Sequence, residues 1–296
     1  MPENDFREKV SKKLHFLPGF TSLPIVPVIR LSGVIGISVP LREGLSMASV
    51  APALEAAFSV RGAKAVALVI NSPGGSPAQS NLIFSRIRAL AEEKDLPVFA
   101  FAEDAAASGG YMLACAADEI FADPFSVIGS IGVVSSGFGF TEAIAKLGVE
   151  RRIHTAGTNK AMLDPFLPED PDDVKRLETL QRDIHRGFKD LVRGRRGERL
   201  QAGERKLFSG EFWTANQALK LGLIDGLGDV RSVMRERYGE DVRLPVISTS
   251  RPWWRRSAGA AVAQRTATHS GMSVAGWADD LIGAVEARFW WLRIGL

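Results

Sequence analysis

Ser108 has the sequence setting that most favours chemistry. It lies in Ala105-Ala-Ala-Ser-Gly-Gly110, where small neighbours would leave its hydroxyl uncrowded. Because it follows a predicted strand and opens a predicted helix, the N–H of Gly109 would point outward at the helix N-terminus, where the dipole stabilises a developing anion. This arrangement offers a serine nucleophile and half of an oxyanion hole. An ordinary helix-capping serine would have the same local sequence, so the motif alone leaves both interpretations open.

A second glycine-rich loop, Asn71-Ser-Pro-Gly-Gly75, follows another predicted strand. Gly74 and Gly75 would let the backbone approach a substrate carbonyl closely, so a second oxyanion donor could come from here. A plain tight turn is the alternative. Two such loops at the same edge of one sheet favour a shared site.

A serine nucleophile needs a base, and the sequence offers two. His154 would titrate near neutrality, but no carboxylate is placed to orient it. Lys160 is followed by Ala161, Met162 and Leu163, and a lysine in apolar surroundings can act as a general base. A lysine is more commonly solvent-exposed, so both alternatives stay open on the residues alone.

The counts of residue types narrow the chemistry further. The chain has 296 residues, with a single cysteine, Cys115, and four histidines whose spacing matches no metal-ligand motif. An internal disulfide and a cysteine-held metal cluster are therefore excluded, and neither a cofactor nor a metal is expected. The formal net charge is +3. We interpret the arginine-rich stretches 186–199 and 251–256 as solvated surface, and no nucleic-acid partner is expected.

Alternating strand and helix patterns must position these loops. Apolar runs predict strands, and apolar residues at helical spacing predict helices. The predicted strands are 25–31, 65–70, 97–101 and 119–122, and the predicted helices are 47–58, 82–94, 108–117, 170–193 and 212–222. Repeated units of this length indicate an α/β fold with a mainly parallel sheet, in which ligands bind beyond the carboxyl ends of the strands.

The chain divides into four parts by composition. Residues 1–22 are predicted to be a charged arm, 23–240 the main domain, 241–273 a flexible linker, and 274–296 an amphipathic aromatic helix. That helix could lie on a membrane or pack against a neighbouring subunit, and we favour the subunit. No signal peptide and no transmembrane segment is recognised, so we expect a cytoplasmic protein with peripheral membrane contact as the alternative.

Six motifs occur in an order that resembles the signal peptide peptidase A family of serine peptidases, in its short single-repeat form. The resemblance covers roughly residues 25–237. Its motifs are Val28-Ile-Arg-Leu-Ser-Gly-Val-Ile35, Asn71-Ser-Pro-Gly-Gly75, Ala106-Ala-Ser-Gly-Gly-Tyr111, Gly129-Ser-Ile-Gly-Val133, Thr155-Ala-Gly-Thr-Asn-Lys160 and Ala218-Leu-Lys-Leu-Gly-Leu-Ile-Asp-Gly226.

The resemblance implies a Clp-protease/crotonase-like fold of repeated ββα units with C-terminal helices, and a Ser–Lys dyad. Ser108 would be the nucleophile, Lys160 the general base, and Ser130 a hydrogen-bond partner that orients the lysine. The amides of Gly109 and of Gly75 or Gly74 would form the oxyanion hole. Related Clp proteases carry a histidine where this chain has residues 125–130, and its absence here moves His154 towards a structural role.

The family further implies a homo-oligomeric ring in which neighbouring subunits help complete each active site. Family members are often anchored by an N-terminal helix, from which this sequence departs, and the departure puts a role in clearing signal peptides within the bilayer in doubt. The expected activity is ATP-independent endopeptidase cleavage of peptides or unfolded, signal-peptide-like segments. Alternatives are a crotonase-like acyl-CoA hydratase or hydrolase, with Glu103 and Asp104 as the nearest acid/base candidates, and a non-catalytic oligomeric scaffold.

Overall fold

The described part of the chain forms a sheet of eight strands. The computed structural model describes residues 23–37, 44–248, 284, 285 and 287–296. The strands are ordered β6-β5-β3-β2-β1-β8, with β4 joining β3 to β7, and the pairings are parallel except β5–β6. Their bounds are β1 Val28–Ser32, β2 Val66–Ser72, β3 Val98–Ala107, β4 Glu119–Ala122, β5 Val127–Gly129, β6 Phe212–Thr214, β7 Gly226–Leu227 and β8 Val246–Ile247. The predicted α/β fold with a mainly parallel sheet is confirmed.

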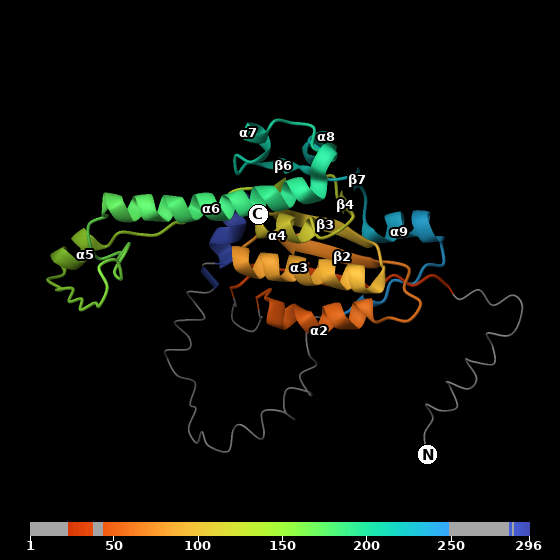
Figure 1. The fold of residues 1–296 in the computed structure, drawn as a ribbon, viewed down its shortest axis with the longest axis horizontal. Helices are drawn as coiled ribbons and strands as arrows, with labels where there is room; N and C mark the ends of the chain where they lie inside the picture. Colours follow the sequence, from red (N-terminus) through yellow and green to blue (C-terminus); the bar gives the residue numbers. More distant parts are fainter. Residues whose placement is uncertain (1–22, 38–43, 249–283, 286) are drawn as a thin grey trace, which may run out of the picture.

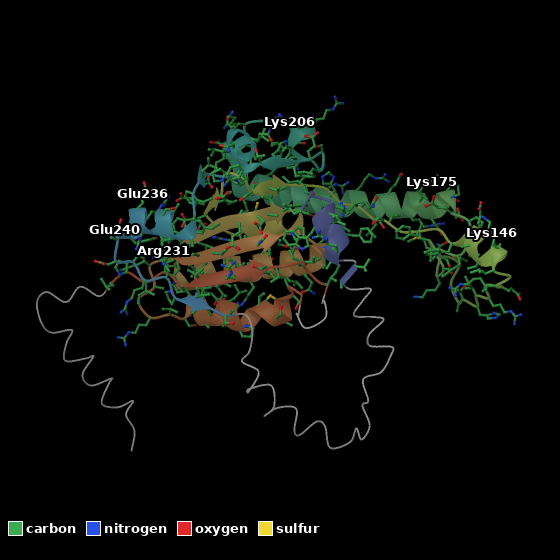
Figure 2. The ribbon with its side chains drawn as sticks, turned by 180° about the vertical axis from the view of Figure 1, so that it is seen from behind. Lys146, Lys175, Lys206, Arg231, Glu236 and Glu240 are labelled. Carbon is green, nitrogen blue, oxygen red and sulfur yellow. The ribbon has the colours of Figure 1, made fainter. Side chains whose placement is uncertain are left out.

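Helices cover both faces of the sheet. On one face lie α2, α3, α4 and the second half of α6, and on the other lie α9 and the C-terminal helix of residues 284–292, in which 286 is not described (Figures 1 and 2). Strand β2 is nearly continuously buried, as its unbroken apolar run predicts for a strand covered on both sides. The bounds are α2 Met47–Phe58, α3 Pro77–Lys94, α4 Gly109–Ala114, α5 Thr141–Lys146, α6 Pro171–Arg196, α7 Glu204–Leu207, α8 Ala215–Lys220 and α9 Val230–Tyr238, with a 3₁₀ turn at Gly197–Arg199.

Two elements differ from their predicted form. The helix predicted from 212 begins only at Ala215, because residues 212–214 pair antiparallel with β5 as strand β6. The N–H of Thr214 donates to Gln217 Oε1 (3.4 Å), which marks the start of that helix. Residues at the start of the predicted 241–273 linker also join the sheet, since β8 pairs with β1. The remaining linker residues 249–273 and the predicted arm 1–22 lie outside the described residues.

Strand β3 leads directly into the candidate site, because Ser108 follows its last residue. Its first half, Phe99–Ala102, pairs with β4, and its last three residues, Ala105–Ala107, pair with β5. Between these halves the register against β2 shifts, as at a β-bulge. The carboxyl end of β3 is thereby turned towards β5, and the turn that follows begins at Ser108.

An arm formed by residues 133–180 projects from this body (Figure 1). It comprises an extended segment, α5, a loop and the first turns of α6. Helix α6 has 26 residues, but its buried residues Phe188, Val192 and Arg196 all lie in its second half. None of residues 132–187 is buried. The arm therefore has no core of its own. Among the described helices, none has the length and hydropathy needed to cross a membrane.

A buried ion pair joins α6 to the chain beyond α8. The Arg196 side chain is 1% exposed, and its Nη1 and Nη2 donate to the Asp225 carboxylate at 2.7 and 3.1 Å. Asp225 also accepts from the N–H of Ile120 (2.8 Å). The pair is thus held from three elements.

We expect Asp225→Asn to lower the free energy of unfolding by about 3 kcal/mol, because it leaves a buried guanidinium without its carboxylate. Urea denaturation measures the loss. Glu150→Gln is the matched control, since the Glu150–Arg152 pair is exposed on both sides and should contribute nothing measurable. Equal stabilities of the two variants would contradict this assignment.

Candidate active site

Ser108 has a backbone conformation that L-residues rarely adopt. Its φ and ψ are 52° and −120°, and its side chain makes no capping hydrogen bond to α4. The conformation is fixed by two backbone hydrogen bonds, from Ser108 N–H to Gly129 O (2.8 Å) and from Met112 N–H to Ser108 O (3.0 Å). Such strain costs about 1–3 kcal/mol and is found mainly at functional sites. Ser108 is therefore not an ordinary helix-capping serine, which was the alternative interpretation of its local sequence.

The glycine loop of β2 approaches Ser108 directly. A Cβ on Gly74 would lie 2.7 Å from Ser108 Cβ and 3.0 Å from Gly109 N, so only glycine permits this contact. Gly75 is equally confined, because a Cβ there would lie 2.1 Å from Ile35 O. Among the described residues, the N–H groups of Gly75 and Gly109 have no hydrogen-bond acceptor. The partly exposed Ser108 thus contacts Gly74, and the two unpaired amides belong to the residues that follow them in the chain, Gly109 and Gly75.

Ser130 lies next to this cluster through the backbone. It follows Gly129, the acceptor for Ser108 N–H, and it too has a positive φ of 53°. Its N–H donates to Glu211 O (2.7 Å). Gly129 packs against Trp213, where a Cβ would lie 2.7 Å from the indole. Ser130 is therefore rigidly placed, although no hydrogen bond joins its hydroxyl to Ser108 within the described residues.

Lys160 lies apart from these residues. It is exposed in the arm, in the loop between α5 and α6, and its ammonium has no hydrogen bond or ion pair with another described residue. Figure 2 shows how far the arm extends, with Lys146 and Lys175 near its outer end. The structure brings together Ser108, Gly74, Gly75, Gly109 and Ser130 but does not place Lys160 against Ser108 of the same chain.

The loop that carries Lys160 is nevertheless ordered by specific contacts. Arg151 pairs with Asp164 (3.0 Å) and stacks over the Phe166 ring at 5.2 Å. The Phe166 N–H and Arg151 hold the pKa of the Asp164 carboxyl below its usual value. Asp173 accepts from Leu163 N–H (3.2 Å), which ties the loop to α6. These contacts fix the conformation of the loop, and Lys160 is exposed on it.

Other chemistry-bearing residues are engaged elsewhere. Burial raises the pKa of the Cys115 thiol to about 12, so this cysteine stays protonated and inert. Glu103 pairs with Arg30 (2.6 Å), and Asp104 accepts from the Asn71 amide (2.5 Å). His154 is exposed in the arm. None of these four is bonded to Ser108 in the described residues.

Comparison with known proteins decides the family. The model of peptidase family S49 matches residues 90–241, more than half of the chain, and this segment contains Ser108, Ser130 and Lys160. The chain belongs to peptidase family S49. This S49 assignment confirms the resemblance to serine peptidases of the signal peptide peptidase A type.

Relatives of this S49 chain differ in their names. A protein of Brucella abortus named Na(+)/H(+) antiporter NhaA is 50% identical over 281 residues, covering 92% of this chain and 37% of that protein. The "Serine protease SPPA, chloroplastic" of Arabidopsis thaliana is 32% identical over 237 residues, covering 77% of this chain and 35% of that protein. The chain thus spans little more than a third of either relative. The antiporter name is given to a protein most of which has no counterpart here, so we carry nothing over from it.

A solved structure also matches the S49 chain. A mutant of the "1510-N membrane-bound stomatin-specific protease", solved in complex with a substrate peptide, is 15% identical, with a TM-score of 0.49. The match covers 82% of this chain and all of that one.

The sequence of the S49 chain did not indicate that His185 lies near the candidate active site. His185 of α6 places Nε2 3.2 Å from Ile131 O, one residue beyond Ser130. Burial lowers the pKa of this imidazole, and the positive charge of the nearby Lys189 lowers it further by a smaller amount. His185 thereby braces the segment that carries Ser130. Its only sequence signal is its position on the inward side of a long polar helix.

We expect Gly74→Ala to reduce peptidase activity at least about tenfold, because the new methyl group would displace Ser108 or the Gly109 amide. Gly33→Ala is a matched control, since Gly33 has nearly the same φ, +110° against +109°, with no atom within 4 Å of the added Cβ. Both variants place alanine at the same positive φ, so comparable activity in the two would show that the contact with Ser108 is unimportant. Initial rates of peptide hydrolysis at matched folded concentrations measure the difference.

Proposed function

We propose that the protein is an ATP-independent serine endopeptidase that cleaves peptides and unfolded, signal-peptide-like segments through an acyl-enzyme. The observation that carries this proposal is the strained, partly exposed Ser108, which contacts Gly74 of the glycine loop and is followed by the unpaired Gly109 amide. A hydroxyl held in that way by its backbone, next to N–H groups without acceptors, is what nucleophilic attack on a carbonyl requires. Membership of peptidase family S49 also supports a peptidase function.

In the proposed reaction, Ser108 Oγ attacks the carbonyl carbon of the scissile peptide bond. The neutral Lys160 amine takes the Ser108 proton, and the N–H groups of Gly109 and Gly75 stabilise the oxyanion, since the Gly74 N–H already donates to Ser72 Oγ (3.2 Å). The tetrahedral intermediate collapses as the lysine ammonium gives that proton to the leaving amine, which leaves an ester on Ser108. Water, deprotonated by Lys160, then hydrolyses the ester and regenerates the hydroxyl. Ser130 donates a hydrogen bond that orients the lysine amine.

Because Lys160 lies in the arm, we propose that it reaches Ser108 of another copy in a homo-oligomer. Exposed apolar residues along the coreless arm support such assembly, since monomeric proteins rarely expose so many on one projection. They include Val134, Phe138, Leu147, Val149, Leu167 and Leu180. We place the enzyme in the cytoplasm or at a membrane surface.

Two measurements on the purified full chain test the proposal. A fluorophosphonate probe should label the protein, and a fluorogenic unstructured peptide should be cleaved without ATP. Absence of both reactions in folded, oligomeric protein would reject the peptidase proposal. Binding of coenzyme A in a thermal-shift assay, with no labelling, would instead favour the crotonase-like alternative.

A further inference from the structure

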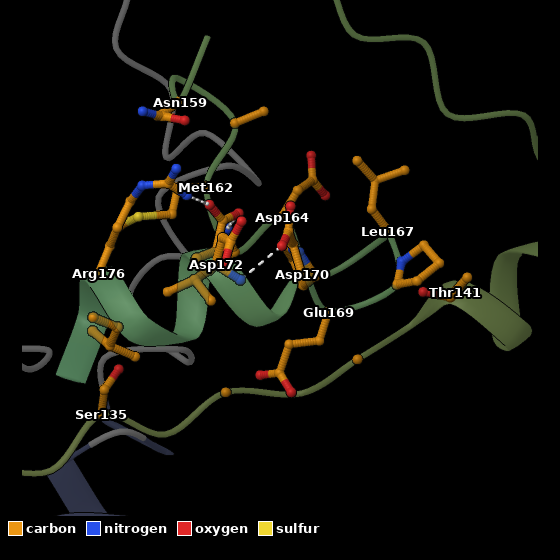
Figure 3. A pocket seen from close by; sticks show the side chains of 18 of the residues that line it. Ser135, Thr141, Asn159, Met162, Asp164, Leu167, Glu169, Asp170, Asp172 and Arg176 are labelled. Carbon is orange, nitrogen blue, oxygen red and sulfur yellow. Dashed lines mark hydrogen bonds and ion pairs between the residues drawn. The ribbon is translucent and has the colours of Figure 1, made fainter.

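The arm contains a hollow that its own chain leaves open. It has a volume of about 1040 Å³ and is lined only by residues between Ser135 and Leu177 (Figure 3). Phe138, Phe140, Met162 and Leu167 contribute exposed apolar surface to it. No described residue of the C-terminal helix reaches it within the same chain.

Carboxylates also line the hollow. Glu169, Asp170, Asp172 and Asp173 all line it, and Figure 3 shows Glu169, Asp170 and Asp172 near Met162 and Leu167. Two of these carboxylates are already in ion pairs, Asp173 with Arg176 (2.8 Å) and Asp172 with Lys175 (2.9 Å), and Glu169 and Asp170 have none with a described residue. The hollow is therefore lined by apolar side chains and by the unpaired carboxylates of Glu169 and Asp170, which suits a partner that is apolar and basic.

The C-terminal helix has two apolar faces. Its inner face packs on the body of its own chain, where Trp291 and Ile294 contact Ala105, Ala107 and Val127. Its outer face carries Val285, Phe289 and Leu292, each about half exposed and spaced four and three residues apart, so they form one stripe. At 100° per residue, Arg288 and Arg293 lie on either side of that stripe. The outer face is thus apolar with a basic border.

We propose that the outer face of the C-terminal helix of one copy docks into the arm hollow of a second copy. The apolar stripe would meet the apolar lining residues, and the two arginines would meet Glu169 and Asp170. An anionic membrane would match the arginines but not explain the acidic hollow.

This docking would bring together the two halves of the proposed active site, and it rests on the function proposed above. The residues on either side of Lys160, Asn159 and Ala161, line the hollow. The helix in turn packs on Ala107, the residue before Ser108. A helix seated in the hollow therefore carries the Ser108 of its own chain towards the Lys160 of the partner.

Subunit mixing gives a directional test. A Ser108→Ala copy retains Lys160, and a Lys160→Met copy retains Ser108, so each is expected to be inactive alone and a mixture active. In the productive pair, the helix belongs to the Lys160→Met copy and the hollow to the Ser108→Ala copy. We expect Leu292→Glu to reduce the activity of the mixture about tenfold or more when it is in the Lys160→Met copy, because it buries a charge. In the Ser108→Ala copy it should have little effect.

The converse variant should show the opposite asymmetry. Phe138→Asp should abolish complementation only in the Ser108→Ala copy. Val246→Glu is a matched control, because Val246 is 62% exposed on the edge strand β8, and it should have no effect in either copy. Equal effects of Leu292→Glu in both copies would overturn the docking.

A mixture without activity would also overturn it, while wild-type labelling and hydrolysis would leave the proposed function standing. Loss of binding to vesicles of anionic lipid in Leu292→Glu, with complementation unchanged, would assign the stripe to a membrane instead.

Discussion

Ser108→Ala is expected to reduce peptide hydrolysis by at least about 10³-fold and to abolish fluorophosphonate labelling. We expect no neighbouring serine to replace the nucleophile, because Ser72 Oγ accepts from Gly74 N–H (3.2 Å) and Ser80 Oγ donates to Ser76 O (2.8 Å). Losses of this size are typical of serine peptidases that lose their nucleophile. Ser59→Ala, at an exposed helix end, is the control and should retain full activity.

A second variant at position 108 distinguishes the backbone strain of this residue from the catalytic role of its hydroxyl. Ser108→Gly should be as inactive as Ser108→Ala but more stable than it by roughly 1 kcal/mol, since glycine adopts a φ of 52° without a steric cost. Urea denaturation of the two variants measures this difference. A Ser108→Gly protein no more stable than Ser108→Ala would mean that the conformation carries no strain, and residual labelling in either variant would show another nucleophile.

Lys160→Met is expected to reduce hydrolysis by roughly 10²–10⁴-fold, the range for loss of a general base. The substitution removes the amine but keeps a flexible apolar chain, so the exposed arm loop should remain folded. Lys146→Met and Lys175→Met are matched controls, because both lysines are exposed on the same arm in i,i+4 and i,i+3 pairs with carboxylates. We expect both to retain activity and the oligomeric state of the wild type.

The two candidate bases can be told apart directly. Full activity in Lys160→Met together with loss of activity in His154→Ala would replace the Ser–Lys dyad by a histidine-based site. Loss in all three lysine variants would instead point to an effect of arm charge on assembly, and sedimentation analysis of the variants would detect it.

The parts of the site that depend on local sequence could be predicted. The apolar run at 65–70 and the small residues around Ser108 specify a strand and a strand-to-helix turn, and the structure has β2, β3 and α4 there. Because parallel strands end at one edge of a sheet, the sequence also predicts the glycine loop at 71–75 near Ser108, and Gly74 does contact it. Short-range patterning sufficed for these elements.

Long-range features were not accessible in the same way. The positive φ of Ser108 depends on its hydrogen bond with Gly129, 21 positions away in the chain, and the shape of β3 depends on pairing first with β4 and then with β5. Strand β6 forms because β5 offers it an edge, although residues 212–214 also fit a helical pattern. Spacing gave no means of telling that Lys160 lies out on an arm. The position of the arm becomes clear only in the structure, where the buried residues of α6 all lie in its second half and its first half extends away from the body.

The most direct test of the central claim is to locate the fluorophosphonate adduct on the wild-type full chain by peptide mapping with tandem mass spectrometry. We predict one adduct per chain at most, on the peptide that contains Ser108, with fragment ions assigning it to that hydroxyl. An adduct on Ser130, Ser72 or any other residue, with Ser108 unmodified, would contradict the proposal that Ser108 is the nucleophile.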